Sequence, residues 1–180
     1  MTKYLYILII FFFNINSNAS NKENIINNLK NTKNFNFEQN INKKIEKGNC
    51  IIEYPRKIYC EYIGSNDKIL VSNGKSLVIK TKVSYYRYPL NKTPLYLILD
   101  KNFLIDKIYN LEERLIDNSL IYFTIKENDH EINVFFDDLT FNLIGWQTKD
   151  VYQNLTITFI SSIKRNEIFD KGIFKLPIQN

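Results

Sequence analysis

The sequence predicts a mainly β protein of the α+β class, with one strongly curved antiparallel sheet, an N-terminal helix and a small helical insertion. Two consecutive hairpins between Gly48 and Ile79 give the first reason. Several stretches of the second half alternate with period two, and helical spacing occurs at two places only. Because no repeat and no Pro/Gly/Ser-rich linker divides the chain, we expect a single domain over residues 20–180.

Residues 1–19 are typical of a secretory signal peptide. Lys3 supplies a short positive region, residues 4–13 are apolar and uncharged, and Ser17-Asn18-Ala19 has the small-x-small pattern of a cleavage site. The apolar run is too short to span a bilayer comfortably, which takes about 20 residues. We therefore expect secretion and removal of residues 1–19, with an uncleaved N-terminal anchor as the alternative.

The charge balance is mildly basic. Lys3 is the one charged residue of the predicted signal peptide, so its removal lowers the net charge from +5 to +4. The densest basic clusters are pairs such as Lys43-Lys44 and Lys164-Arg165, and no nucleic-acid-binding motif accompanies them. We interpret the lysines as a solvated surface and expect no nucleic-acid partner, although a basic face would suit an acidic partner or an anionic membrane surface.

The first predicted element is an amphipathic helix over residues 21–33. Ile25, Ile26 and Leu29 share one of its faces at helical spacing. An Asn-rich segment that ends in Phe37-Glu38-Gln39 then leads into a first strand.

The two hairpins that follow place large side chains on one face of the sheet. The first turns at Tyr54-Pro55-Arg56-Lys57, and the second at Asn73-Gly74, where a type I′ turn would need positive φ at both central residues. A face this bulky and apolar must be covered by other elements or offered to a ligand. By strand parity, its members are Ile52, Tyr54, Ile58 and Tyr62.

A short apolar helix is predicted after Thr93-Pro94. Thr is a good N-cap, and Pro suits the first helical position because its missing N–H has no partner there in any case. Leu95, Ile98 and Leu99 then fall on one side of the helix. We interpret an apolar helix of this kind, set over an apolar sheet face, as a lid.

The second half of the chain returns to strands, with turns predicted at Asn128-Asp129 and Asp137-Asp138. In the last long strand, Leu155, Ile157 and Phe159 face one way and Thr156 and Thr158 the other. The predicted strands cover residues 120–126, 131–136, 139–143, 155–160 and 173–176.

The sequence contains no recognisable catalytic or metal-binding constellation. His130 is the single histidine, and no Gly-x-Ser-x-Gly nucleophile accompanies it. Glu112-Glu113 and Asp137-Asp138 are adjacent pairs, whose members would point to opposite faces of a strand. One His and two Cys make no metal-ligand set, and no phosphate-binding glycine loop is present. We expect a protein that is not an enzyme and needs no cofactor or metal.

The two cysteines, Cys50 and Cys60, fall on the two arms of the first hairpin. Two cysteines in a secreted domain are typical of a disulfide, and pairing of the arms would bring the sulfurs together. Two buried free thiols are the alternative. We interpret Trp146 as a packing residue, with a position on the rim of a cavity as the alternative.

Several segments, taken in order, carry a family resemblance. They are Phe37-Glu-Gln39, Gly48-x-Cys-x-Ile-x-Tyr-Pro55-Arg-Lys-Ile-Tyr-Cys-Glu-Tyr62, residues 69–77, Thr93-Pro94-Leu95, residues 145–150 and residues 174–177. In their order and spacing the chain resembles the LolA family of periplasmic lipoprotein carriers. The resemblance implies an incomplete, strongly curved antiparallel β-barrel with a helical lid over a hydrophobic cavity that shelters acyl chains.

The resemblance also implies partners and a place in the cell. Acylated lipoproteins would be the cargo, taken in the periplasm by a monomeric carrier from an ATP-driven inner-membrane release complex, with an outer-membrane acceptor as a further partner. An envelope lipid-binding or stress-sensing module on the same half-barrel is the alternative, and a secreted hydrolase is disfavoured. Cavity candidates are Ile52, Tyr54, Ile58, Cys60 and Tyr62 from the hairpin, and Leu95, Ile98 and Leu99 from the lid.

One position departs from the family pattern. The family often carries Arg immediately before the hairpin proline, where it hydrogen-bonds the lid. This chain has Tyr54 there, and Arg56 lies two residues further on, inside the expected turn. The sequence leaves open which of the two residues, if either, takes over this role.

Overall fold

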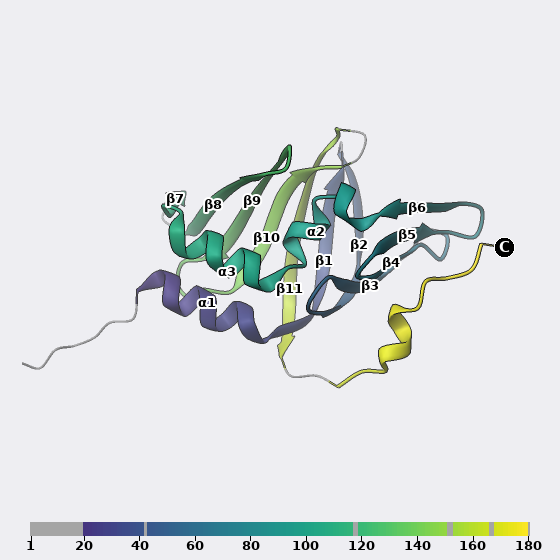
Figure 1. Ribbon diagram of the computed structural model, residues 1–180, viewed down its shortest axis with the longest axis horizontal. Coiled ribbons are helices and arrows are strands. Elements are labelled where there is room, and N and C mark those ends of the chain that lie inside the picture. Colours follow the sequence, from purple (N-terminus) through teal and green to yellow (C-terminus); the bar gives the residue numbers. More distant parts are fainter. Residues whose placement is uncertain (1–19, 42, 117–118, 151–152, 166–167, 180) are drawn as a thin grey trace, which may run out of the picture.

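The computed structural model describes residues 20–41, 43–116, 119–150, 153–165 and 168–179, so the predicted signal peptide lies outside the described residues. Within these ranges, eleven strands form one antiparallel sheet that curls around three α-helices (Figure 1). The sheet stays open, because β6 and β7 are its two edges. The predicted antiparallel half-barrel of the α+β class is confirmed.

The strands are β1 (Thr32–Ile41), β2 (Lys44–Glu53), β3 (Lys57–Tyr62), β4 (Ile69–Asn73), β5 (Ser76–Lys80), β6 (Tyr85–Pro89), β7 (Arg114–Ile116), β8 (Leu120–Glu127), β9 (His130–Asp137), β10 (Leu143–Lys149) and β11 (Leu155–Arg165). The helices are α1 (Asn21–Asn31), α2 (Leu95–Ile98) and α3 (Lys101–Asn110), with 3-10 turns η1 (Leu90–Lys92) and η2 (Lys171–Phe174). None of the helices in the described ranges combines the length and apolarity needed to cross a membrane.

The first and the last long strands meet at the centre of the sheet. Phe37 of β1 lies opposite Ile160 of β11 on one side and opposite Gly48 of β2 on the other. One meander runs outward from this centre through β2 to β6, and the other runs through β11 to β7. Both halves therefore curve around one concave face, over which α1, α2 and α3 lie (Figure 1).

The predicted N-terminal helix packs onto the concave side. Its C-terminal boundary is Asn31, two residues earlier than expected, because the backbone that follows pairs with β11. Lys22 Nζ donates to the carbonyl of Leu111 (2.6 Å), the C-cap residue of α3. Carbonyls at the end of a helix have no partner within the helix, so Lys22 supplies one. The residues that α1 buries are the predicted Ile25, Ile26 and Leu29.

The second hairpin is present, but its predicted turn type is wrong. The loop between β4 and β5 is Gly74-Lys75, and within it only Gly74 has positive φ (93°). A glycine at the first central position alone is the type II′ arrangement. Asn73 stays at the end of β4, where its side-chain oxygen accepts from the N–H groups of Lys75 and Ser76 (3.0 Å each).

The predicted strand over residues 139–143 is a turn. The Asp137 side chain accepts from the N–H of Thr140 (2.6 Å), and the Asp137 carbonyl accepts from the N–H of Phe141 (2.9 Å). Phe141 has φ of 56°, a left-handed conformation that a strand does not contain. β10 begins only after this turn. The sequence analysis did not predict β10, because a glycine and polar residues interrupt the apolar alternation of this strand.

The predicted final strand over residues 173–176 is also wrong, whereas the other three strands predicted in the second half are confirmed as β8, β9 and β11. The Asp170 carboxylate accepts from the N–H of Gly172 (2.8 Å) and starts η2 instead. η2 packs against β3 and β4 (Figure 1). Three residues are buried here outside the main core cluster: Val71, Val78 and Phe174.

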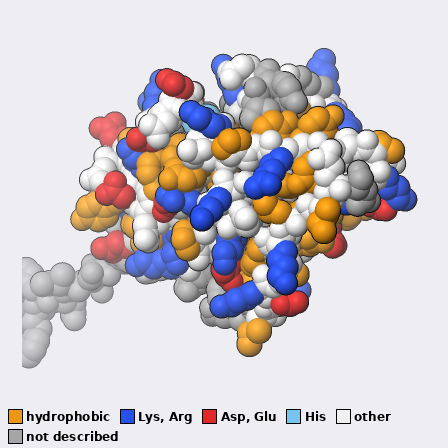
Figure 2. All heavy atoms as spheres, turned by 45° about the vertical axis from the view of Figure 1, so that its right-hand side comes forward, with side chains coloured by type: hydrophobic (Ala, Val, Ile, Leu, Met, Phe, Trp, Pro, Cys, Tyr) orange, Lys and Arg blue, Asp and Glu red, His pale blue; other side chains and the backbone are white. Residues whose placement is uncertain are grey.

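Apolar side chains also reach the surface. In the view of Figure 2, they lie between scattered Lys and Arg side chains rather than beside one basic block. On β11 the exposed face carries Leu155 and Phe159, and the Phe159 ring stacks on that of Phe135 with ring centroids 6.5 Å apart.

Close packing at Gly48 generates a stability prediction. A Cβ at this position would lie 2.0 Å from the Glu61 carbonyl oxygen and 2.6 Å from the Phe37 ring, so backbone would have to shift. We expect Gly48→Ala to lower the free energy of unfolding by about 3 kcal/mol in urea titrations. Gly64→Ala is the matched control: it has open space but positive φ (69°), and we expect a loss of about 1 kcal/mol. Equal losses in the two variants would contradict the packing argument.

Candidate functional site

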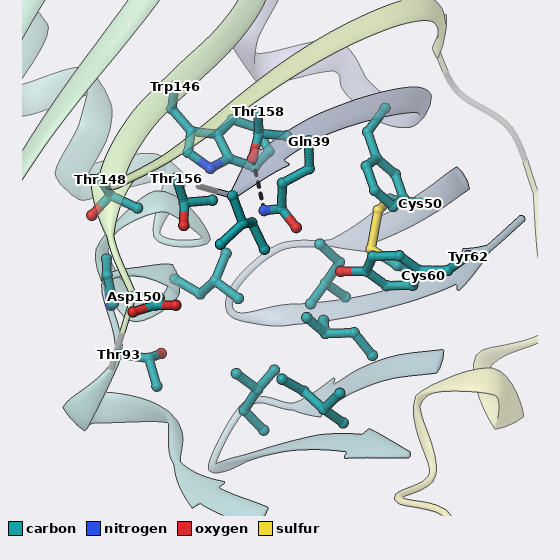
Figure 3. Close-up of a pocket in the computed structure, with 18 of the residues that line it drawn as sticks. Gln39, Cys50, Cys60, Tyr62, Thr93, Trp146, Thr148, Asp150, Thr156 and Thr158 are labelled. Atoms are coloured by element: carbon teal, nitrogen blue, oxygen red, sulfur yellow. Dashed lines mark hydrogen bonds between the residues drawn. A yellow bond between two sulfur atoms is a disulfide. The ribbon is translucent and has the colours of Figure 1, made fainter. Parts of the chain in front are cut away.

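A cavity of about 190 Å³ lies between the concave face of the sheet and residues 93–99, which we name the lid segment (Figure 3). Both halves of the sheet contribute to it, with β1 to β6 on one side and β10 and β11 on the other. Most of the wall is hydrophobic. Its apolar and aromatic side chains are Phe35, Phe37, Ile41, Cys50, Ile58, Cys60, Tyr62, Leu70, Leu77, Ile79, Tyr88, Pro94, Leu95 and Trp146.

One side of the cavity is polar instead, and we name Gln39, Thr148, Thr156 and Thr158 the polar strip (Figure 3). Gln39 Nε2 donates to Thr158 Oγ1 (3.0 Å). The period-two alternation predicted for β11 is present, and its polar side is the inner one. Thr156 and Thr158 are buried, whereas Leu155 and Phe159 on the outer side are 46% and 49% exposed.

The structure brings half of the predicted cavity residues together in the wall. They are Ile58, Cys60, Tyr62 and Leu95. Ile52, Ile98 and Leu99 are equally buried, but they belong to the packed core and do not line the cavity. Tyr54 is half-buried against the same core. Two residues after Tyr54, the backbone N–H of Arg56 donates to the Leu99 carbonyl at the end of the lid segment.

Trp146 contributes to the wall from β10 and belongs to the packed core, so the interpretation as a packing residue is confirmed. It is 5% exposed and meets the Phe35 ring edge to face, with centroids 6.2 Å apart. Leu70 lies opposite Cys60 and Ile79 opposite Leu70, so strand parity carried into the second hairpin would have found both. The polar strip carries no comparable signal in the sequence.

The predicted disulfide between Cys50 and Cys60 is confirmed. The two residues lie directly opposite each other on β2 and β3, with Cα atoms 4.1 Å apart. Both residues line the cavity, so the bond crosslinks two strands of the apolar wall (Figure 3).

The lid segment is short and has little local stabilisation. α2 spans four residues, and its N-cap is Pro94, which offers no side-chain hydrogen bond. The predicted capping role of Thr93 is wrong, because its hydroxyl donates to the carbonyl of Leu90 (2.8 Å) in the preceding turn. Leu97 and Ile98 are buried, so packing rather than capping holds the segment.

Arg56 connects the first hairpin to the end of the lid segment. Its backbone N–H donates to the Leu99 carbonyl (2.8 Å), and its Nη2 lies 2.5 Å from Asp100 Oδ2. The guanidinium carbon lies 4.0 Å from the centroid of the Tyr96 ring. Asp100 also caps α3, since its Oδ1 accepts from the Phe103 N–H (3.2 Å). Arg56 thus contacts the junction of α2 and α3.

The titratable groups considered for chemistry remain apart. His130 is half-buried at the start of β9, and Asp137 holds the turn before β10. Glu113 accepts a hydrogen bond from Asn21 (3.2 Å) on the surface. In the part of the chain that the structure describes, no three His, Cys, Asp or Glu side chains form a group that could hold a metal ion.

Sequence comparison identifies the family. The family described as outer membrane lipoprotein carrier protein LolA matches residues 28–177. The chain belongs to the LolA family. No curated protein sequence matches it.

Solved structures with this fold are distant from this LolA-family chain in sequence. An uncharacterized conserved protein from Thermus thermophilus is 8% identical with a TM-score of 0.51, over 87% of this chain and 92% of that one. The LolA superfamily protein NE2245 from Nitrosomonas europaea is 8% identical (TM-score 0.45, 87% and 96%). LprF from Mycobacterium bovis is 11% identical (TM-score 0.44, 83% and 94%). At these identities the likeness concerns the fold alone.

In this LolA-family chain the hydrogen bond to the lid segment comes from Arg56 and not from Tyr54, the residue before the hairpin proline. Arg56 has φ of 67° and lies inside the turn, where it reaches Leu99 and Asp100. Tyr54 makes no hydrogen bond to the described part of the lid, and burial alone raises the pKa of its hydroxyl. Its ring lies 5.5 Å from Lys101 Nζ.

A buried ion cluster stands beside Tyr62 in the cavity wall. Glu46 is 5% exposed and lies 2.5 Å from Lys68 Nζ and 2.9 Å from Lys44 Nζ. Burial by itself would raise the pKa of Glu46, but the hydrogen bonds and charges of the two lysines outweigh it and hold this pKa below its usual 4.5. Lys68 Nζ also lies 4.1 Å from the centroid of the Tyr62 ring. Burial, followed by the Glu46 charge, raises the pKa of Tyr62.

The Glu46 cluster generates a prediction on pH. Because the pKa of Glu46 is lower in the folded than in the unfolded chain, the unfolded chain binds the proton more readily. The contribution of Glu46 is complete above its usual pKa of 4.5, which applies to the unfolded chain, and is lost as the pH falls through the lower folded pKa. We expect the drop in unfolding free energy between pH 6 and pH 3, measured by urea titration, to be smaller in Glu46→Gln than in the wild type. Glu38→Gln removes a side chain that is 45% exposed and serves as the control. Parallel curves for Glu46→Gln and wild type would contradict the assignment.

Proposed function

We propose that this protein is a periplasmic carrier that shields the acyl chains of lipoproteins in its cavity while they move from the inner to the outer membrane. The main support for this proposal is the apolar cavity between the sheet and a lid segment that few polar contacts hold in place. Membership of the LolA family, described as outer membrane lipoprotein carriers, supports it. The proposed activity is binding and transfer, without a catalysed reaction.

The energetics of acyl chains explain why such a wall is needed. Each CH₂ removed from water contributes about 0.8 kcal/mol, so a chain of about 15 CH₂ groups needs roughly 12 kcal/mol of compensation on leaving a membrane. An apolar wall built from both halves of the sheet offers surface of this kind. The predicted lining residues Ile58, Cys60, Tyr62 and Leu95 would contact the chains.

The lid segment would have to move for cargo to enter. The cavity of about 190 Å³ is smaller than ligand sites usually are, at about 300–1,000 Å³. α2 has no side-chain cap, and Arg56 supplies its polar contacts with the hairpin, so opening would break few hydrogen bonds. We propose that the closed arrangement holds no cargo and that displacement of the lid segment joins the cavity to a larger apolar surface.

The proposed partners follow from the family. A carrier of this kind would receive acylated lipoproteins from an ATP-driven inner-membrane release complex and deliver them to an outer-membrane acceptor, acting as a monomer. Mass spectrometry of lipids extracted from protein isolated from its native periplasm tests the cargo class. Recovery of the protein without lipid or lipoprotein would contradict the proposal.

Trp146 allows a direct measurement of cavity binding, because it is the one tryptophan of the chain and lines the cavity. We expect a fatty acid with bromine on its chain to quench Trp146 fluorescence in the wild type. Leu95→Glu places a carboxylate in the wall from the half-buried lid position, and we expect it to weaken binding by at least about tenfold. Tyr109→Glu adds the same charge at a 68% exposed position of α3 and should bind like the wild type. Equal quenching in both variants would place the ligand elsewhere.

Arg56 generates a prediction on the rate of opening. Arg56→Gln removes the ion pair with Asp100 and the contact with Tyr96 but keeps the backbone bond to Leu99. Partly exposed contacts of these kinds contribute about 1 kcal/mol, so we expect cargo uptake to accelerate about fivefold. Stopped-flow quenching of Trp146 measures the rate. Arg87→Gln, which removes an exposed arginine of β6, is the control; an unchanged rate in Arg56→Gln would show that Arg56 does not limit opening.

A further inference from the structure

A second, polar pocket of about 320 Å³ adjoins the apolar cavity. Pro94, Thr148, Lys149 and Asp150 line both spaces. Figure 3 shows Thr148 and Asp150 at the side of the cavity where the polar strip ends, away from the disulfide. The two spaces therefore meet along the end of β10.

The polar pocket exists because β9 and β10 separate. Their pairing ends at Asn133 and Gln147, although both strands continue beyond these residues. Thr148 Oγ1 reaches the Glu131 carbonyl (3.4 Å) across the gap. The Asp150 carboxylate is held in place at the other side by the backbone and side-chain N–H groups of Asn154 (2.9 and 3.1 Å). The walls of the gap are thus fixed, while its interior stays open.

Asn133 is the unusual residue of this pocket. It is 6% exposed, and its side-chain Oδ1 is buried without a hydrogen-bond partner among the described residues. Leaving a buried acceptor unpaired is costly, and the great majority of such atoms in native structures have a partner. An unpaired acceptor in the wall of a pocket indicates a ligand that donates a hydrogen bond.

Besides the Asn133 acceptor, the pocket offers carboxylates to a cationic donor. Three carboxylates line the pocket against two ammonium groups, and a third ammonium group, that of Lys126 outside the lining, lies 3.2 Å from Glu131. The titratable lining residues are Asp129, His130, Glu131 and Asp150 against Lys92 and Lys149.

We infer that the polar pocket binds the primary amine of a diacylated amphiphile whose chains occupy the apolar cavity. Asn133 Oδ1 accepts an N–H of the amine, and the Asp150 carboxylate stands at the passage between the two spaces. The polar strip lines the way from one space to the other and suits the ester groups between chains and head. This inference rests on the proposed carrier function. The amine is either the α-amine of a diacylated N-terminal cysteine or the head group of an ethanolamine phospholipid.

Displacement of the brominated fatty acid from the purified protein, read from the recovery of Trp146 fluorescence, tests the inference. The ligands are a dipalmitoylglyceryl-cysteine peptide with a free α-amine and its N-acetylated counterpart. We expect the wild type to bind the free amine about tenfold more tightly. Asn133→Leu should reduce this preference to about twofold or less and leave the affinity for the acetylated peptide unchanged. Thr124→Val, on the neighbouring strand opposite Asn133 and outside both spaces, should keep the preference.

A second variant and a second pair of ligands complete the experiment. Asn133→Asp keeps the shape of the side chain and adds a negative charge, so it should strengthen the preference even if Asn133→Leu fails to fold. Phosphatidylethanolamine against phosphatidylcholine with the same chains separates the two sources of the amine, and discrimination in either pair supports the inference. Equal affinity within both pairs in the wild type overturns it, while the carrier proposal stands. If no diacyl ligand displaces the fatty acid, the carrier proposal itself fails.

Discussion

The concave face of the sheet must be kept from water without being filled, and the rest of the structure depends on this constraint. A protein core normally fills its interior as densely as an organic crystal. Here, side chains of β1 to β6 and of β10 and β11 surround a cavity of about 190 Å³, and Thr93, Pro94 and Leu95 of the lid segment close one side of it. Buried side chains hold the helices on the sheet, and Lys22 at the end of α3 and Arg56 at the junction of α2 and α3 add polar contacts.

The wall and the lid segment differ in how they are stabilised. The wall belongs to a continuous hydrogen-bonded ladder, and the bond between Cys50 and Cys60 links two of its strands covalently. The lid segment has one four-residue helix without a cap and depends on buried leucines and on Arg56. Segments with few backbone and polar contacts open at lower free energy than the sheet to which they are attached. A stiff wall and a movable cover are what reversible binding of large apolar groups requires.

Strand parity predicted a useful part of this site and failed where tertiary contacts decide. It placed Ile58, Cys60 and Tyr62 correctly, because pairing in the first hairpin is local. Ile52 has the same parity but lies where the lid segment packs onto the hairpin tip, a contact between residues far apart in the sequence that parity does not report.

The other failures have the same origin. β10 escaped prediction because glycine and polar residues break its pattern, and those residues are the ones that approach β11 closely and face the polar spaces. The left-handed backbone at Arg56 and Phe141 redirects the chain at single residues. Residue spacing therefore predicted the sheet and its curvature, and left the lid contact and the polar side of the cavity to be found in the structure.

The inward threonines of β11 argue that the cavity is built for an amphiphile rather than for hydrocarbon alone. In the wall of a purely apolar site, hydroxyl and amide groups would lose their hydrogen bonds to water. This loss costs free energy unless other polar groups replace the water. Gln39 and Thr158 form one hydrogen bond with each other, and each side chain can form further hydrogen bonds on the cavity side. The apolar and polar groups are also segregated: the disulfide and Tyr62 lie at one side, and Thr148 and Asp150 at the other (Figure 3). A ligand with two chemically distinct ends would gain from this arrangement in one orientation only, with its chains toward the disulfide and its head toward the gap between β9 and β10.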